Sequence, residues 1–186
     1  MSLAQYVHRM CNQELIGLAK NRFIDVPTQE AIAKHPYRRA KTYLASNSSL
    51  CPSVAKDLWD MRGYTLKCEL IQAGTYKDTP DKYRELYYDH QSRFKRSPWK
   101  MLTVFLRSYY YGNGPDATPP DIIEQIYKDW IQPADLPAEY SYFHRTRIEA
   151  VLRHPNCTLD VAVKISTTEE PRIRKLAFEA ISRLSP

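Results

Sequence analysis

Thirteen prolines are spread along the 186-residue chain, whereas glycine occurs only five times. Apolar residues at helical spacing follow most of these prolines, and long strand-like alternation of polar and apolar residues is missing. Proline is tolerated in the first turn of a helix because the amide hydrogen it lacks would be unpaired there anyway. The pattern therefore predicts short helices that start at Pro27, Pro52, Pro80, Pro98, Pro120 and Pro171.

Three of these starts contain a hydroxyl side chain that is suited to cap the helix. Thr79, Ser97 and Thr118 each stand directly before a proline. We expect their side-chain oxygens to accept hydrogen bonds from the free N–H groups of the first turn. Helices of about 8 to 12 residues are only marginally stable alone, so we also expect them to pack on one another.

A short sequence pattern recurs along the chain. Leu18-Ala-Lys-Asn21 is followed by Pro27, and Leu44-Ala-Ser-Asn47 is followed by Pro52, an offset of 26 residues. Repeats with a period of 20 to 50 residues are typical of solenoids. We predict an all-α fold, a short irregular α-solenoid of about five antiparallel helix pairs. Further copies of the pattern begin at Leu70, Phe105 and Val151.

Two stretches interrupt the repeats and suggest a domain organisation. An insertion near 109–118 begins with three tyrosines, and a linker over 132–138 contains two prolines. We expect an N-terminal helical repeat array over 1–131 that includes the insertion, and C-terminal repeats over 139–186 that pack on it.

The turns between the predicted helices carry a resemblance to a known family. The segment from Ala33 to Leu58 contains Ala33-Lys-His-Pro36, and the pattern returns at Val151-Leu-Arg-His-Pro155 and over 170–177. With these turns the chain resembles the leucine-rich repeat variant family, an α-solenoid family related to HEAT repeats. The similarity covers roughly residues 14 to 74 and 144 to 184. It implies short helices stacked into a right-handed superhelix that serves as a binding scaffold, and it carries over no catalytic residue.

Motifs for cofactors, metals and catalysis are missing from the sequence. Gly112-Asn-Gly114 lacks the Lys-Ser/Thr of a phosphate-binding loop, and the four cysteines and five histidines show no metal-ligand spacing. We predict no catalytic residue, metal or cofactor, and we expect the cysteines to be reduced and mostly buried. His35 and His154 both precede a proline, so we expect each imidazole to hydrogen-bond a turn carbonyl.

Basic residues gather in two windows that contain no Asp or Glu. The first, 31–56, includes Arg38, Arg39 and Lys41. The second, 90–115, holds five cations, four of which lie within 90–100 and are interleaved with Phe94 and Trp99, as base-stacking sites often are. A stacked array could align these cations with others near later helix starts along one face, which would suit an acidic protein surface or the phosphates of a nucleic acid.

Tyrosine is the other excess, with 14 copies, and three of them open the insertion near 109–118. Tyr and Arg are favoured at protein-binding hot spots because they combine rigid apolar area with a polar end. The predicted partner-binding residues are Arg38, Arg39, Lys41, Arg93, Lys95, Arg96, Trp99, Lys100, Tyr110, Tyr111, Arg145 and Arg147.

These observations predict a non-enzymatic binding or adaptor module that recognises an acidic protein partner through a basic, Tyr/Arg-rich face. The alternative is a nucleic-acid-binding protein that uses the same face. A third hypothesis is a HEAT-like DNA glycosylase in which Trp59, Trp99 and Trp130 stack on bases, with a pocket assembled from distant helices.

The sequence also bears on where the protein resides. No apolar run approaches the roughly 20 residues that a membrane helix needs, and the N-terminus lacks the pattern of a signal peptide. We expect a soluble, cytoplasmic protein with no membrane partner and no small-molecule cofactor.

Overall fold

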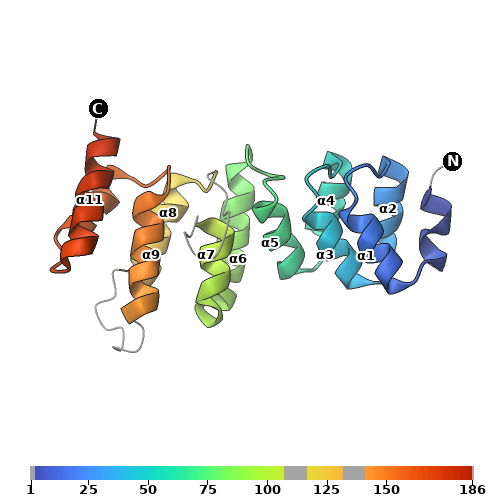
Figure 1. Ribbon diagram of the computed structural model, residues 1–186, viewed down its shortest axis with the longest axis horizontal. Coiled ribbons are helices and arrows are strands. Elements are labelled where there is room, and N and C mark those ends of the chain that lie inside the picture. Colours follow the sequence, from blue (N-terminus) through green and yellow to red (C-terminus); the bar gives the residue numbers. More distant parts are fainter. Residues whose placement is uncertain (1–2, 107–116, 132–140, 186) are drawn as a thin grey trace. The chain divides into compact units, whose positions relative to one another are not determined.

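The computed structural model describes residues 3–106, 117–131 and 141–185, without the side chains of 95, 98, 99 and 141–143. The described residues form eleven α-helices and one 3-10 helix, and none of them lies in a strand (Figure 1). The prediction of an all-α fold is confirmed. Contacts divide the chain into two compact units, Met1–Lys77 and Asp78–Pro186.

The first unit is built of short helices in two layers. In one layer α1 packs on α3 and α3 packs on α5, and in the other η1 packs on α2 and α2 packs on α4. Successive helices therefore alternate between the layers. The elements are η1 (Leu3–Arg9), α1 (Asn12–Lys20), α2 (Val26–Lys34), α3 (Arg38–Ala45), α4 (Pro52–Asp60) and α5 (Tyr64–Gln72).

The second unit contains the longer helices. Helix α6 contacts α7 and α8, α8 contacts α9, and α11 packs on both α9 and α10. Helix α6 is kinked at His90, where the backbone leaves helical geometry with φ −125° and ψ 16°. The elements are α6 (Pro80–Arg96), α7 (Pro98–Phe105), α8 (Pro120–Trp130), α9 (Ser141–Arg153), α10 (Leu159–Ser166) and α11 (Pro171–Leu184).

The predicted interruptions fall largely outside the described residues. The linker over 132–138 lies entirely outside them, and only the last two residues of the insertion near 109–118 are described. The boundary between the two compact units lies elsewhere, after Lys77.

The predicted helix starts are confirmed. Helices α2, α4, α6, α7, α8 and α11 each have a proline in the first turn. Proline thus marks the beginning of six of the eleven described α-helices, as its missing N–H and fixed φ dictate.

The three predicted capping side chains are wrong. Thr79 and Ser97 occupy the cap positions but accept no capping hydrogen bond, and their ψ angles are 77° and 74°. The caps that do accept one, Asp25 and Thr158, have extended backbones with ψ 161° and 153°. Thr118 is fully buried, and its hydroxyl donates instead to the carbonyl oxygen of Phe105 at 2.7 Å.

A common turn follows helices in both units. The side chains of Asn21 and Asn47 accept a hydrogen bond from the backbone N–H two residues further on, at 2.9 and 3.0 Å. His35 and His154 accept the same bond through Nδ1, each at 3.1 Å. In both turns Nδ1 takes the place of the asparagine Oδ1 as an acceptor, a bond that the sequence-based expectation of an imidazole bonded to a turn carbonyl did not include.

Two buried amide side chains tie the Asn47 turn to preceding elements of the first unit. Asn47 is 5% exposed, and its Nδ2 donates to the carbonyl oxygens of Ala19 at 3.0 Å and Asn21 at 2.9 Å. Gln29 of α2 donates to the carbonyl oxygen of Ser49 at 3.1 Å and accepts from the N–H of Cys51 at 2.8 Å. These contacts join residues 20 to 28 positions apart in the sequence.

Tyr83 offers a test of the core of the second unit. The side chain is fully buried, and its hydroxyl has no hydrogen-bond partner among the described residues. Because phenylalanine removes a buried, unsatisfied polar group, we expect Tyr83→Phe to raise the free energy of unfolding at neutral pH by up to about 1 kcal/mol. Urea unfolding followed by circular dichroism measures the change, and the exposed Tyr88→Phe is the control.

The same variant changes the alkaline stability. Burial raises the pKa of Tyr83 to about 12, above the value near 10 of an unfolded tyrosine. The stability that the neutral phenol contributes is therefore complete below pH 10 and is lost as the pH rises toward 12. We expect Tyr83→Phe to flatten this decline. A loss of more than about 1 kcal/mol at pH 7 would contradict the prediction, because it would mean that the hydroxyl is satisfied.

Candidate binding surfaces

Two cations of the first unit lie against one tyrosine ring. Lys20, at the end of α1, places Nζ 4.3 Å from the centroid of the Tyr43 ring on α3. Arg39, one helical turn before Tyr43, has its guanidinium carbon 6.0 Å from the same centroid. Cations are attracted to the face of an aromatic ring, so these contacts hold the two charges in place. We call Lys20, Arg38, Arg39 and Tyr43 the Tyr43 patch.

The charge of the Tyr43 patch is not neutralised by the rest of the described chain. Lys20, Arg38 and Arg39 form no ion pair with any described residue. Hydrogen bonding to Tyr43 raises the pKa of the Arg39 guanidinium further above its already high value. The first unit has 11 Lys and Arg against 6 Asp and Glu, so it carries +5 of the chain's net charge of +6.

An exposed phenylalanine follows Lys20 in the sequence. Phe23 is 94% exposed, in the turn where its own N–H donates to Asn21 Oδ1 at 2.9 Å. Phe23 was not among the binding residues predicted from the sequence, although its apolar side chain in the turn after Asn21 could have indicated an exposed contact residue. Phe23 adds a bare aromatic ring three residues from Lys20, and the exposed Arg22 precedes it.

The predicted residues of α3 divide between two environments. Arg38 and Arg39 are exposed, as expected for binding residues. Lys41 is half-buried, and its Nζ lies 3.8 Å from Met61 Sδ. The outer part of α3 therefore presents its two arginines, whereas the stem of Lys41 covers apolar surface.

The second predicted basic segment spans the end of α6 and the start of α7. Arg93 and Arg96 are exposed, and Lys100 is half-buried. The side chains of Lys95 and Trp99 lie outside the described residues, as do Tyr110 and Tyr111.

Phe94 does not interleave with these cations, so that interpretation is wrong. The side chain is fully buried and stacks on Tyr87 with a centroid distance of 6.1 Å. Phe105 meets both rings edge to face, at 5.2 Å from Phe94 and 5.4 Å from Tyr87. The three rings form the aromatic centre of the second unit, where Phe94 cannot stack on a base.

The prediction for α9 is also corrected. Arg147 is only 3% exposed, with its guanidinium carbon 5.3 Å from the Trp130 ring centroid and Nη1 3.5 Å from the Trp130 carbonyl oxygen. Arg145, two residues earlier, is exposed and pairs with Glu170 at 2.8 Å. Residues two apart lie on different sides of a helix, so both arginines cannot belong to one exposed stripe.

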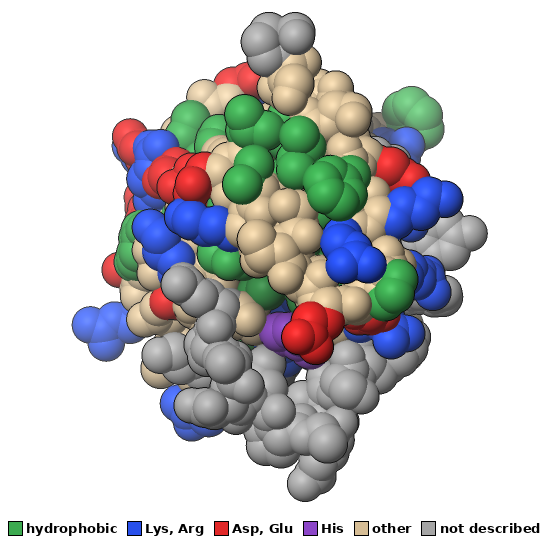
Figure 2. Space-filling view, turned by 90° about the vertical axis from the view of Figure 1, so that its left-hand side faces the viewer, with side chains coloured by type: hydrophobic (Ala, Val, Ile, Leu, Met, Phe, Trp, Pro, Cys, Tyr) green, Lys and Arg blue, Asp and Glu red, His purple; other side chains and the backbone are tan. Residues whose placement is uncertain are grey.

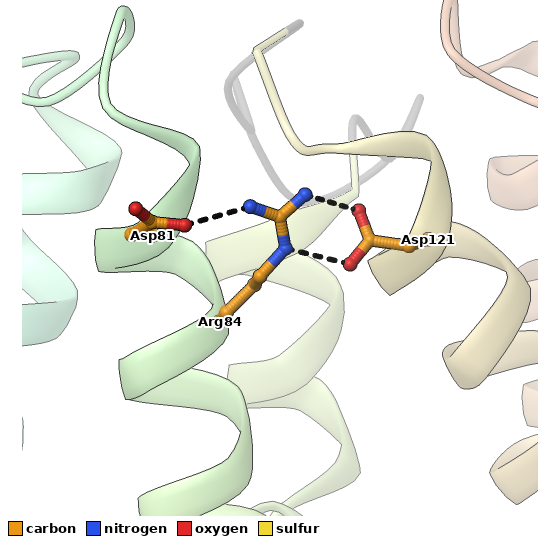
Figure 3. A network of polar contacts seen from close by, with 3 residues as sticks. All are labelled: Asp81, Arg84 and Asp121. Carbon is orange, nitrogen blue, oxygen red and sulfur yellow. Dashed lines mark hydrogen bonds and ion pairs between the residues drawn. The ribbon is translucent and has the colours of Figure 1, made fainter.

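An ion-pair cluster ties two helices of the second unit together. Arg84 of α6 binds Asp121 of α8 through two hydrogen bonds, at 2.8 and 2.9 Å, and Asp81 through a third at 2.8 Å (Figure 3). Hydrogen bonding to Arg84 lowers the pKa of Asp121, and the two carboxylates raise the pKa of Arg84. The cluster joins α6 to α8, and because two carboxylates bind the single guanidinium of Arg84, it leaves no free cation for a ligand.

Trp130 lies in a second tie between α6 and α8. Its Nε1 donates to the Tyr87 hydroxyl at 3.2 Å, which in turn donates to Asp129 Oδ2 at 2.8 Å. Amide groups of Gln91 and Gln125 donate to the same carboxylate at 2.6 and 2.9 Å. Desolvation first, and then the hydrogen bond to Asp129, raise the pKa of Tyr87. This network holds the buried side chains of Tyr87 and Trp130 in place between the two helices.

Two of the three tryptophans in the glycosylase hypothesis are therefore core residues. Trp130 is buried, and Trp59 is buried against Tyr76, with ring centroids 5.0 Å apart. The Trp99 side chain lies outside the described residues.

The four cysteines differ in their exposure. Cys68 and Cys157 are buried, Cys51 is half-buried and Cys11 is exposed, so the expectation of mostly buried thiols holds for two of four. Burial raises the pKa of Cys157 to about 11.

The described residues contain no group of three His, Cys, Asp or Glu side chains arranged to hold a metal ion. No described helix combines the length and the apolar character that a membrane crossing requires.

Comparisons with known proteins identify no family for the chain. No family model, no curated protein and no solved structure is significantly similar to the chain.

Proposed function

We propose that the chain is a non-enzymatic binding module that recognises an acidic protein partner, with the Tyr43 patch at the centre of the contact. The observation that carries the proposal is the Tyr43 ring with Lys20 and Arg39 held against it. Rings and arginines of this kind are the residues that dominate protein interfaces. The contacts with the Tyr43 ring favour positions of the Lys20 and Arg39 cations beside it before binding, so less side-chain entropy is lost when a carboxylate approaches.

The scaffold belongs to the same proposal. The two layers of the first unit, with successive helices alternating between them, support a short, irregular, HEAT-like α-solenoid of antiparallel helix pairs. The shared Asn and His turns support repeats of the leucine-rich repeat variant type. Such scaffolds present binding residues from successive repeats on one surface.

A protein partner is favoured over a nucleic acid by the aromatic residues. Nucleic-acid grooves combine a track of cations with rings on which bases stack. Phe94, Trp59 and Trp130 are buried, so these three rings are not open to bases. Phe23 is open, and an isolated apolar anchor beside cations suits an acidic surface with an apolar pocket.

The test reverses the charges of α3. A fluorescein-labelled peptide of alternating Glu and Leu serves as the acidic probe, and fluorescence anisotropy at low salt measures its affinity. We expect Arg38→Glu combined with Arg39→Glu to weaken binding by about tenfold or more, because attraction at two sites becomes repulsion. The matched control is Lys56→Glu with Lys128→Glu, which changes the net charge equally at exposed positions outside the patch.

Two outcomes would contradict the proposal. The first is an absence of peptide binding at low salt, or an equal loss in the control variant. The second is stronger binding to a mixed-sequence DNA duplex whose affinity falls steeply with salt, with a slope of about −0.9 per contacted phosphate, and which is lost on reversing Arg93 and Arg96. That second result would establish the nucleic-acid alternative.

A further inference from the structure

The outer face of α11 is apolar and charged but is covered by no described element. Phe178 is 55% exposed at the middle of this face, whereas Ile173, Ala177 and Ala180 on the opposite side are buried. Figure 2 shows hydrophobic side chains gathered on the surface that faces the viewer, with Lys, Arg, Asp and Glu around them. The residues that line the shallow groove along α11 are Pro171, Arg174, Lys175, Phe178, Glu179 and Ser182.

The charged residues on this face lack ion pairs within the described chain, whereas their neighbours are paired. Arg145 pairs with Glu170 and Arg172 pairs with Glu149, so the neighbouring charges of α9 and α11 are compensated. Lys175 and Glu179 lie one turn apart on the exposed face, and neither forms an ion pair with a described residue. Two cations without an ion pair to a described residue, Arg174 and Lys175, therefore lie beside Phe178 in the groove, together with one such carboxylate, Glu179.

This arrangement is complementary to itself. If two copies of α11 pack antiparallel with a two-fold axis at the level of Ala177, Lys175 lies opposite Glu179 of the second copy. The symmetry creates the reciprocal pair as well, because an isologous contact repeats every interaction. The two Phe178 rings then lie on either side of the axis and cover each other.

We propose that α11 is a homodimerisation surface, with a second copy of the chain packed antiparallel along the groove. The helix has 14 residues and is therefore about 21 Å long. One pair of helices of this length buries less than the roughly 1,600 Å² of a standard interface, so the dimer is weak and depends on concentration. Dimerisation would also join two Tyr43 patches in one particle and increase the avidity for a multivalent acidic partner.

The experiment uses charge reversal and mixing of the full-length chains. Sedimentation velocity at concentrations from about 1 µM to about 1 mM follows the monomer–dimer equilibrium. We expect Lys175→Glu to abolish the dimer, because the two-fold axis produces two Glu–Glu contacts. Glu179→Lys is expected to do the same through two Lys–Lys contacts. Both positions are exposed, so circular dichroism should show unchanged folding.

The decisive measurement mixes the two single variants. A chain with Lys175→Glu is complementary to a chain with Glu179→Lys, so an equimolar mixture should form a heterodimer although neither variant dimerises alone. The double variant carrying both substitutions should dimerise again. Phe178→Ser should weaken the dimer of the otherwise wild-type chain. When it is added to the charge variants, the same combinations of chains should still form a dimer.

The outcomes separate this proposal from the proposed function. A wild-type chain that stays monomeric up to the highest concentration overturns the dimer, whatever the result with the acidic peptide. A dimer that persists in both single charge variants also overturns it, because the contact then lies elsewhere. Failure of the Tyr43 patch to bind peptide leaves these sedimentation results unaffected, since the two surfaces belong to different units.

Discussion

Replacing Asn47 by aspartate is expected to lower the free energy of unfolding of the first unit by about 3 to 5 kcal/mol. The Asn47 amide nitrogen donates to the carbonyl oxygens of Ala19 and Asn21 in a site where the residue is 5% exposed. Aspartate keeps the oxygen that accepts from the N–H of Ser49. It replaces the two donors by a carboxylate oxygen that faces two carbonyl oxygens, so bonds are lost and a charge is buried against like dipoles.

Two further variants separate these contributions. Asn47→Ala removes all three hydrogen bonds without adding a charge, and we expect it to cost about 2 to 3 kcal/mol. Asn21→Asp is the matched control, because Asn21 is exposed and its side chain accepts from Phe23 N–H as Asn47 accepts from Ser49 N–H. A carboxylate can keep that bond, so we expect a change within about 0.5 kcal/mol.

The pH dependence of Asn47→Asp identifies the buried charge. Burial and the facing carbonyl oxygens raise the folded pKa of the new carboxyl group above its unfolded value near 4. The protonated form is therefore tolerated, and the extra destabilisation relative to Asn47→Ala should fade as the pH falls toward 4. Urea unfolding at pH 7 and pH 4, with hydrogen exchange to localise the change, measures this. Equal losses in Asn47→Asp and Asn21→Asp would contradict the prediction.

The helix starts could be predicted because they depend on local chemistry. A proline fixes its own φ and removes its own N–H, whatever surrounds it, and six helices begin accordingly. The capping bonds could not be predicted in the same way, since they depend on the backbone angles of Thr79 and Ser97, whose ψ values of 77° and 74° the residue types alone do not fix. Thr118 has a partner, Phe105, that lies 13 residues away.

The candidate binding residues were predictable only in part. The acid-free window around α3 indicated cations without a neutralising carboxylate nearby, and Arg38 and Arg39 indeed form no ion pair with a described residue and are exposed, whereas their role in binding stays a prediction. Arg147 belongs to the buried side of α9, where Trp130 of another helix meets it. The charge pair between Arg145 and Glu170 joins residues 25 positions apart, so a count along the sequence cannot reveal it.

Replacing Phe94 by alanine is expected to lower the free energy of unfolding of the second unit by about 3 to 5 kcal/mol. The Phe94 ring is fully buried, stacks on Tyr87 and meets Phe105 edge to face at 5.2 Å. Its removal leaves a cavity among rings that are held by two helices, α6 and α7, so the gap cannot close fully. Phe178→Ala is the matched control, because that ring is 55% exposed and its loss should cost less than about 0.5 kcal/mol.

The comparison also distinguishes a core role for Phe94 from a binding role. A ring that stacked on bases would be exposed, and its removal would reduce nucleic-acid affinity while leaving the unfolding transition unchanged. We expect the reverse for Phe94→Ala, namely a lower urea midpoint and faster hydrogen exchange in α6 and α7. Under conditions where the variant is still folded, its affinity for a DNA duplex should equal that of the wild type. A selective loss of affinity with unchanged stability would place Phe94 at the surface and contradict its position against Tyr87 and Phe105.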